Sequence, residues 1–90
     1  MKRTIWKFPI KIQDDVQKLV VRGRDARPLT VQMQGGVPTV WIELTPIDSG
    51  AATELHVRVV PTGREFVPSG EYLGTVQEAN GALIWHVYVG

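Results

Sequence analysis

The chain has 90 residues and a mass of 10.0 kDa, which is enough for one small hydrophobic core, and we expect a single domain over residues 1–90. The absence of cysteine excludes disulfides, thiolate metal centres and cysteine nucleophiles. The net charge of +1 gives no reason to expect nucleic acid as a partner, and no apolar run approaches the roughly 18 residues of a membrane helix. We therefore expect a small cytoplasmic protein without a signal peptide or membrane segment.

The basic residues are concentrated in the first third of the chain. Residues 1–27 contain eight basic and three acidic residues, which gives +5, and residues 28–90 contain two basic and six acidic residues, which gives −4. Two interpretations stay open. The basic third forms a surface for an anion or for an acidic neighbour, or the two parts cancel when they fold together.

Alternation of apolar and polar residues predicts strands from end to end. The expected strands lie at about residues 6–12, 19–23, 29–34, 39–44, 54–59, 72–77 and 83–89. Pro9 cannot donate a backbone hydrogen bond, so it predicts an edge strand or a bulge.

Turn residues separate the expected strands. We expect a turn between Asp25 and Pro28, a tight hairpin at Gly35–Gly36, and positive φ angles at Asn80–Gly81. Loops are expected at residues 45–52 and 61–70, and no segment has a convincing helical period. The pattern predicts an all-β protein, a small antiparallel β-sandwich or open barrel of about seven strands.

Residues for enzyme chemistry are scarce. Ser49 and Ser69 stand in loops rich in glycine and proline, and neither lies in a nucleophile elbow. His56 and His86 fall within strands, and the carboxylate of Glu54 shares a strand face with His56, which alone is a weak sign of a metal site. We expect no catalytic residues, no metal site and no cofactor.

The segment RGRDAR at residues 22–27 is the strongest candidate for binding an anion. Arg22 and Arg24 flank Gly23 and project to one side if the segment is extended, and Arg27 follows. Guanidinium groups match phosphate oxygens, and a glycine lets backbone amides come close to an anion. The alternative is a solvated hairpin turn in which Asp25 neutralises one arginine.

Further strand residues extend this candidate site. Trp41 and Tyr88 stand on the polar sides of their strands and are candidates for stacking a base, whereas Trp6 and Trp85 are expected in the core. Arg58 shares a strand face with His56, which suits a shallow anion site, or it pairs across strands with Glu43 or Glu54. The predicted ligand-binding residues are Arg22, Arg24, Arg27, Trp41, Arg58 and Tyr88.

The two ends of the chain carry distinctive motifs. RTIWKFP stands at residues 3–9, GEYLGTVQ at 70–77, and GALIWHVY at 81–88. Together they resemble a small uncharacterised family of proteins of similar length that bacteriophages and prophages encode. The resemblance spans nearly the whole chain and implies a phage product that acts in the host bacterial cytoplasm.

This context suggests a non-enzymatic binding protein. The leading hypothesis is an oligomeric counter-defence factor that sequesters an anionic nucleotide signal, with a pocket between subunits. One alternative is an inhibitor or adaptor that binds a host protein through the edge strand containing Pro9 or through exposed Trp41, Ile84 and Tyr88. The other alternative is a minor structural protein of the phage.

Overall fold

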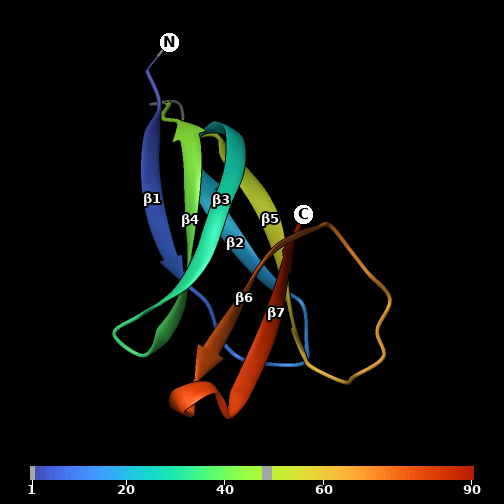
Figure 1. Ribbon diagram of the computed structural model, residues 1–90. Helices are drawn as coiled ribbons and strands as arrows, with labels where there is room; N and C mark the ends of the chain where they lie inside the picture. The colour runs from blue at the N-terminus through green and yellow to red at the C-terminus, as the bar shows by residue number, and fades with distance from the viewer. Residues whose placement is uncertain (1, 48–49) are drawn as a thin grey trace.

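A computed structural model describes residues 2–47 and 50–90 of the chain, and these residues form seven strands in two antiparallel sheets (Figure 1). The strands are β1 (Thr4–Pro9), β2 (Gln17–Arg22), β3 (Arg24–Gln34), β4 (Val37–Thr45), β5 (Ala52–Pro61), β6 (Glu71–Glu78) and β7 (Leu83–Val89). The predicted all-β class is confirmed, and the sheets form a sandwich that does not close into a barrel. No helix among the described residues has the length and apolarity that crossing a membrane requires.

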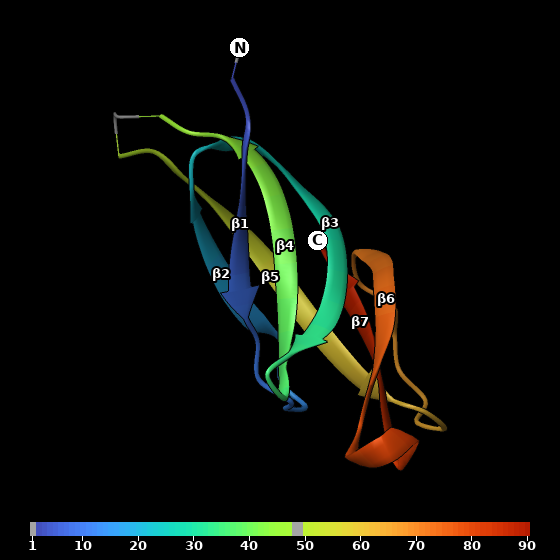
Figure 2. The same cartoon turned by 60° about the vertical axis from the view of Figure 1, so that its left-hand side comes forward.

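The two sheets stack face to face. One has three strands in the order β1-β4-β3, and the other has four in the order β2-β5-β7-β6. The edge strands β3 and β6 pack against each other on one side of the sandwich, which leaves β1 and β2 on the other side (Figures 1 and 2). The predicted edge position of the strand with Pro9 is confirmed, because β4 is the one described strand that pairs with β1.

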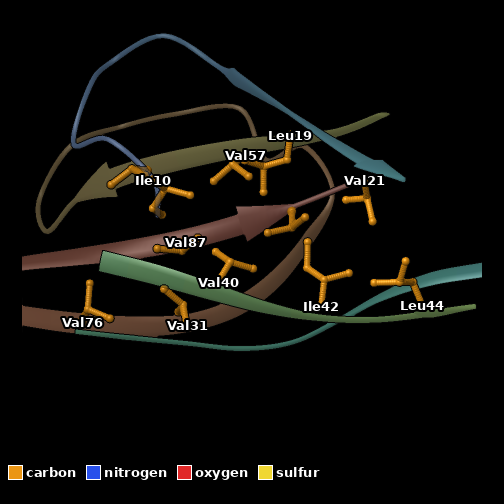
Figure 3. Close-up of a cluster of buried hydrophobic side chains, with 12 residues drawn as sticks. Ile10, Leu19, Val21, Val31, Val40, Ile42, Leu44, Val57, Val76 and Val87 are labelled. Atoms are coloured by element: carbon orange, nitrogen blue, oxygen red, sulfur yellow. The ribbon is translucent and has the colours of Figure 1, made fainter. Parts of the chain in front are cut away.

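The core lies between the sheets and is built mainly from valine, isoleucine and leucine (Figure 3). β4 runs through the middle of its sheet and contributes Val40, Ile42 and Leu44, which are all fully buried. Val57 and Val87 from the four-stranded sheet are also fully buried and belong to the same cluster. Alternation along each strand sends these aliphatic side chains inward and leaves the next residue on the outer face.

The predicted turns at the two hairpins have the expected geometry. Gly35 and Gly36 both have positive φ angles, of 57° and 80°, and they join β3 to β4. Asn80 and Gly81 also have positive φ, of 59° and 85°, within the short 3-10 turn Ala79–Gly81. Glycine and asparagine enter this region of backbone space at low cost, which is why the sequence identified both turns.

The predicted turn between Asp25 and Pro28 is wrong. β3 begins at Arg24 and runs through this segment, with two register shifts against β4, between Arg24 and Arg27 and between Pro28 and Thr30. Proline and aspartate are tolerated here because β3 is an edge strand, and each bulge leaves a residue outside the regular hydrogen-bond ladder.

The first strand is also shorter than predicted. β1 ends at Pro9, and the buried Ile10 donates its backbone N–H to the carbonyl of Pro38 at 2.9 Å as the chain leaves the sheet. Trp6 was expected in the core and is instead 43% exposed. It stands opposite the buried Ile42 on the inner face, but β1 lies at an open side of the sandwich, so part of its ring meets solvent. Trp85 packs against the core, as predicted.

Candidate ligand-binding site

The segment RGRDAR does not form one extended stretch. Arg22 ends β2 in the four-stranded sheet, and Arg24 begins β3 in the three-stranded sheet, so the chain changes sheets at Gly23. The expectation that Arg22 and Arg24 project to one side of a single strand is therefore wrong.

Gly23 has a structural role at this crossing. Its N–H donates to the carbonyl of Ala51 at 3.1 Å, and its carbonyl accepts a hydrogen bond from the Thr53 hydroxyl at 3.0 Å. A Cβ here would lie 2.4 Å from Cδ1 of Leu44 and 2.6 Å from the carbonyl oxygen of Thr45. The predicted use of Gly23 for close approach to an anion is wrong, because its amide is occupied and β4 fills the adjacent space.

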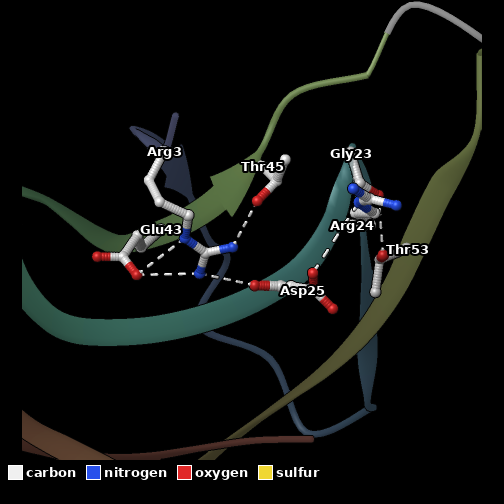
Figure 4. Close-up of polar contacts among 7 residues, drawn as sticks. All are labelled: Arg3, Gly23, Arg24, Asp25, Glu43, Thr45 and Thr53. Atoms are coloured by element: carbon white, nitrogen blue, oxygen red, sulfur yellow. Dashed lines mark hydrogen bonds and ion pairs between the residues drawn. The ribbon is translucent and has the colours of Figure 1, made fainter. Parts of the chain in front are cut away.

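Arg3 donates hydrogen bonds to three oxygen atoms beside this crossing (Figure 4). Its guanidinium donates to Glu43 Oε2 at 2.9 Å, to the Thr45 hydroxyl at 2.9 Å and to the carbonyl of Asp25 at 2.8 Å. Glu43 stands opposite Arg27 in the ladder, but Arg3 is its ion-pair partner. Asp25 Oδ2 lies 4.0 Å from Arg24 Nε as an exposed ion pair, whereas the alternative of a hairpin turn over this segment is wrong because the chain passes into the other sheet.

Trp41 lies on the outer face of the three-stranded sheet, the face turned away from the other sheet. In register it stands between Lys7 of β1 and Thr30 of β3, and it is half-buried. Tyr88 lies on the outer face of the four-stranded sheet, on the opposite side of the sandwich. Within one chain, Trp41 and Tyr88 therefore cannot stack on the same base.

Arg58, Tyr88 and Tyr72 stand side by side on the outer face of the four-stranded sheet. Arg58 of β5 is opposite Tyr88 of β7, and Tyr88 is opposite Tyr72 of β6. The rings of Tyr72 and Tyr88 meet edge to face with centroids 5.6 Å apart, and Phe66 from the loop between β5 and β6 lies 5.3 Å from Tyr88. We call Arg58, Tyr88 and Tyr72 the tyrosine row.

Arg58 is a half-buried cation without a counter-charge. Its Nε is buried and has no hydrogen-bond partner, and no described residue forms an ion pair with it. The alternative pairing with Glu54 or Glu43 is wrong. Glu54 lies 3.7 Å from Lys18 and 3.4 Å from His56, and Glu43 belongs to the other sheet. A buried polar atom without a partner is costly, and guanidinium groups suit anions, so Arg58 is a candidate anion-binding residue.

His86 is held by hydroxyl groups on both sides of its ring. Thr75 Oγ1 lies 2.9 Å from Nδ1, Thr62 Oγ1 lies 2.7 Å from Nε2, and the Tyr72 hydroxyl bonds to Thr75. Both ring nitrogens thus have hydrogen-bond partners, and these bonds fix the orientation of the His86 ring beside the tyrosine row.

Within residues 2–47 and 50–90, no three acidic or histidine side chains gather as metal ligands. Ser49, one of the two serines considered above, lies outside the described residues.

A cleft of about 540 Å³ adjoins the tyrosine row where β3 and β6 diverge. Exposed Arg27 lines it from β3, Glu71 and Tyr72 line it from β6, and half-buried Leu55 and Leu73 supply apolar surface. Register shifts on both strands accompany this opening.

The structure therefore divides the predicted residues. Arg58 and Tyr88 are neighbours, and Tyr72 connects them to the cleft that Arg27 lines. Arg22 pairs with Ala52, six residues before Arg58 on β5. At about 3.3 Å per residue, the two arginines are about 20 Å apart. Arg24 and Trp41 belong to the other sheet.

Fold and site define a small β-sandwich with an arginine–tyrosine surface beside a cleft. The chain belongs to the family described as "Domain of unknown function (DUF7352)", whose model matches residues 1–90. The resemblance to a small uncharacterised family is confirmed at this level. Comparison with curated proteins and with solved structures gives no match.

Proposed function

We propose that this protein is a non-enzymatic binding protein that holds a small anionic nucleotide on the tyrosine row and in the adjoining cleft. The observation that carries the proposal is the unmatched Arg58 guanidinium beside two tyrosines that lead into a cleft lined by Arg27. A volume of about 540 Å³ falls in the range of small-molecule sites.

Each part of a nucleotide has a suitable neighbour in this arrangement. Arg58 offers a planar donor to phosphate oxygens on the outer face of the four-stranded sheet, and Arg27 supplies a second positive charge at the rim of the adjoining cleft. Tyr72 and Tyr88 offer aromatic surface to a base. Glu71, which lines the same cleft, is a hydrogen-bond acceptor for sugar hydroxyls.

The biological setting belongs to the same proposal. The end motifs suggest a phage protein, and binding without turnover suits a counter-defence factor that removes a nucleotide signal in the host cytoplasm. The tyrosine row is open on the outer face of its sheet, so a second copy would cover a ligand that one chain holds on one side only. This supports an oligomer.

Isothermal titration calorimetry with a panel of cyclic and linear nucleotides tests the proposal. We expect saturable binding of at least one of them, weakened at least about tenfold by Arg58→Gln and by Tyr72→Ala. Arg22→Gln is the matched control, because Arg22 is exposed, lies on the same sheet and is remote from the row. Absence of heat with every nucleotide, or equal weakening by the control, would contradict the proposal.

A host-protein inhibitor or adaptor is the second candidate. The specific observation is apolar exposure on the edge strand β1, where Ile5 is 53% and Trp6 is 43% exposed. A pull-down from host lysate separates the two candidates, because a nucleotide-sequestering protein retains no stoichiometric protein partner. Association with purified particles would instead indicate a minor structural phage protein.

A further inference from the structure

The strand β2 forms one edge of the four-stranded sheet (Figure 2). No described strand pairs with its outer side, so its outward backbone groups are unpaired among the described residues. His56, which stands opposite Lys18, exchanges both of its backbone hydrogen bonds with Gly90, at 2.7 and 2.9 Å. Lys18 and His56 therefore form a non-hydrogen-bonded pair, and the N–H and C=O of Lys18 point away from β5. Hydrogen-bonded and non-hydrogen-bonded pairs alternate along an antiparallel ladder, so the N–H and C=O groups of Val20 and Arg22 also point away from β5.

The other edges of the sandwich are less suited to pairing with a new strand. β3 and β6 carry register shifts and pack against each other, and β1 ends in a proline. β2 pairs with β5 without any shift from Gln17 to Arg22. The Gln17 side chain is bonded to the backbone of Lys11 at 2.9 and 2.7 Å, so the open stretch begins at Lys18.

We propose that the edge of β2 accepts an extended acidic segment of a partner protein as a fifth strand of this sheet. The three residues whose N–H and C=O groups point away from β5 are Lys18, Val20 and Arg22. Their side chains lie on the outer face of the sheet, so this face of β2 presents a cation, an apolar side chain and a second cation. Val20 is 59% exposed, and Arg22 has no hydrogen bond or ion pair with any described residue. Directly opposite side chains interact most strongly, so the matching strand has acidic, apolar and acidic residues at alternate positions.

The same charges exclude a second copy as the preferred occupant. When two β2 strands pair antiparallel about Val20, Lys18 of one chain lies opposite Arg22 of the other at both ends. Like charges that lie directly opposite destabilise a strand pair, and lysine at an edge protects a sheet against pairing with itself. An acidic partner turns this repulsion into attraction.

Apolar residues of the added strand also find a surface. Trp6 faces the space between the sheets, since it stands opposite buried Ile42, and it is partly exposed on the side where β1 and β2 lie. In a strand added next to β2, every second side chain points to the inner face of the sheet, toward the space in which Trp6 lies. A blocked seven-residue peptide of sequence VEVVVEV is therefore a suitable glutamate–valine probe, because it places glutamate opposite Lys18 and Arg22, valine opposite Val20 and valine at every inward position.

Nuclear magnetic resonance titration of the ¹⁵N-labelled protein with this peptide tests the proposal. We expect shifts at the backbone amides of Lys18, Val20 and Arg22, and exchange of these amide protons slowed at least about tenfold at saturation. A lysine–valine peptide should bind at least about tenfold more weakly. The variant Lys18→Glu/Arg22→Glu should reverse this preference, whereas Lys7→Glu on β1 is the control that should not.

Three outcomes would overturn the proposal. The first is the absence of shifts at these amides with the glutamate–valine peptide. The second is that the glutamate–valine peptide binds equally well after N-methylation of the amides that would donate hydrogen bonds to β2. Equal binding would mean that charge attraction alone, without backbone hydrogen bonds, holds the peptide. The third is a dimer in which these amides are already protected without peptide, which would place a second copy on the edge. The β2 interaction is independent of the nucleotide site.

Discussion

Replacement of Gly23 by alanine tests whether the glycine between Arg22 and Arg24 serves the fold or a ligand. Gly23 has a φ of 150°, which residues with a Cβ rarely adopt, and this strain costs about 1–3 kcal/mol. The new Cβ would also lie 2.4 Å from a Leu44 methyl group, and such overpacking costs about 1–3 kcal/mol. The sum is a large part of the roughly 5–13 kcal/mol that stabilises a domain of this size.

Denaturant titration of Gly23→Ala and of the control Gly35→Ala measures these terms. Gly35 also has a positive φ, of 57°, but nothing lies within 4 Å of its Cβ position, so only a strain of about 1–2 kcal/mol is expected. Gly23→Ala should be the more destabilised variant and, where folded, should bind nucleotide as the parent does, because the Gly23 amide serves Ala51. Equal stability losses in the two variants, or selective loss of binding in Gly23→Ala, would refute this reasoning.

Three further predictions concern the core, the Arg3 contacts and the loop. Ile42→Ala should cost about 2–5 kcal/mol in denaturant titration, because the side chain is fully buried, and a cost below 1 kcal/mol would mean that the core closes around the gap. Arg3→Ala should cost about 1 kcal/mol, and less in high salt, since its pair with Glu43 is partly exposed; a cost independent of salt contradicts this. Phe66→Ala should accelerate proteolysis between Thr62 and Gly70, because the ring contact with Tyr88 is lost, and an unchanged rate argues against that anchor.

The strands could be predicted because their alternation is a local property. The last strand agrees with the structure at both ends, and both glycine-containing turns have the expected φ angles. Errors arise where the chain leaves a sheet or carries an extra residue. The path of residues 24–28 depends on pairing with β4, which lies ten or more residues further along the chain, and local propensity contains no such information.

The tyrosine row shows why the site was only partly predicted. Counting back from the pair Glu78–Leu83 places Leu73 opposite Tyr88, because the register is regular as far as Gly74. An extra residue at Leu73 shifts the strand by one, so that Tyr72 stands opposite Tyr88. A one-residue shift moves each side chain to the other face of the sheet, and nothing in the sequence marks this bulge clearly.

The charge asymmetry of the sequence gains a physical meaning from the sheet order. β1 and β2 carry basic residues and lie next to β4 and β5, so Arg3 pairs with Glu43 and Lys18 with Glu54. Folding thus cancels part of the excess, as one of the two interpretations states. Arg58 is different, because it stands on the outer face of its sheet and no described residue forms an ion pair with it. Folding therefore leaves this part of the positive charge uncancelled, and the calorimetry of Arg58→Gln tests whether an anion cancels it.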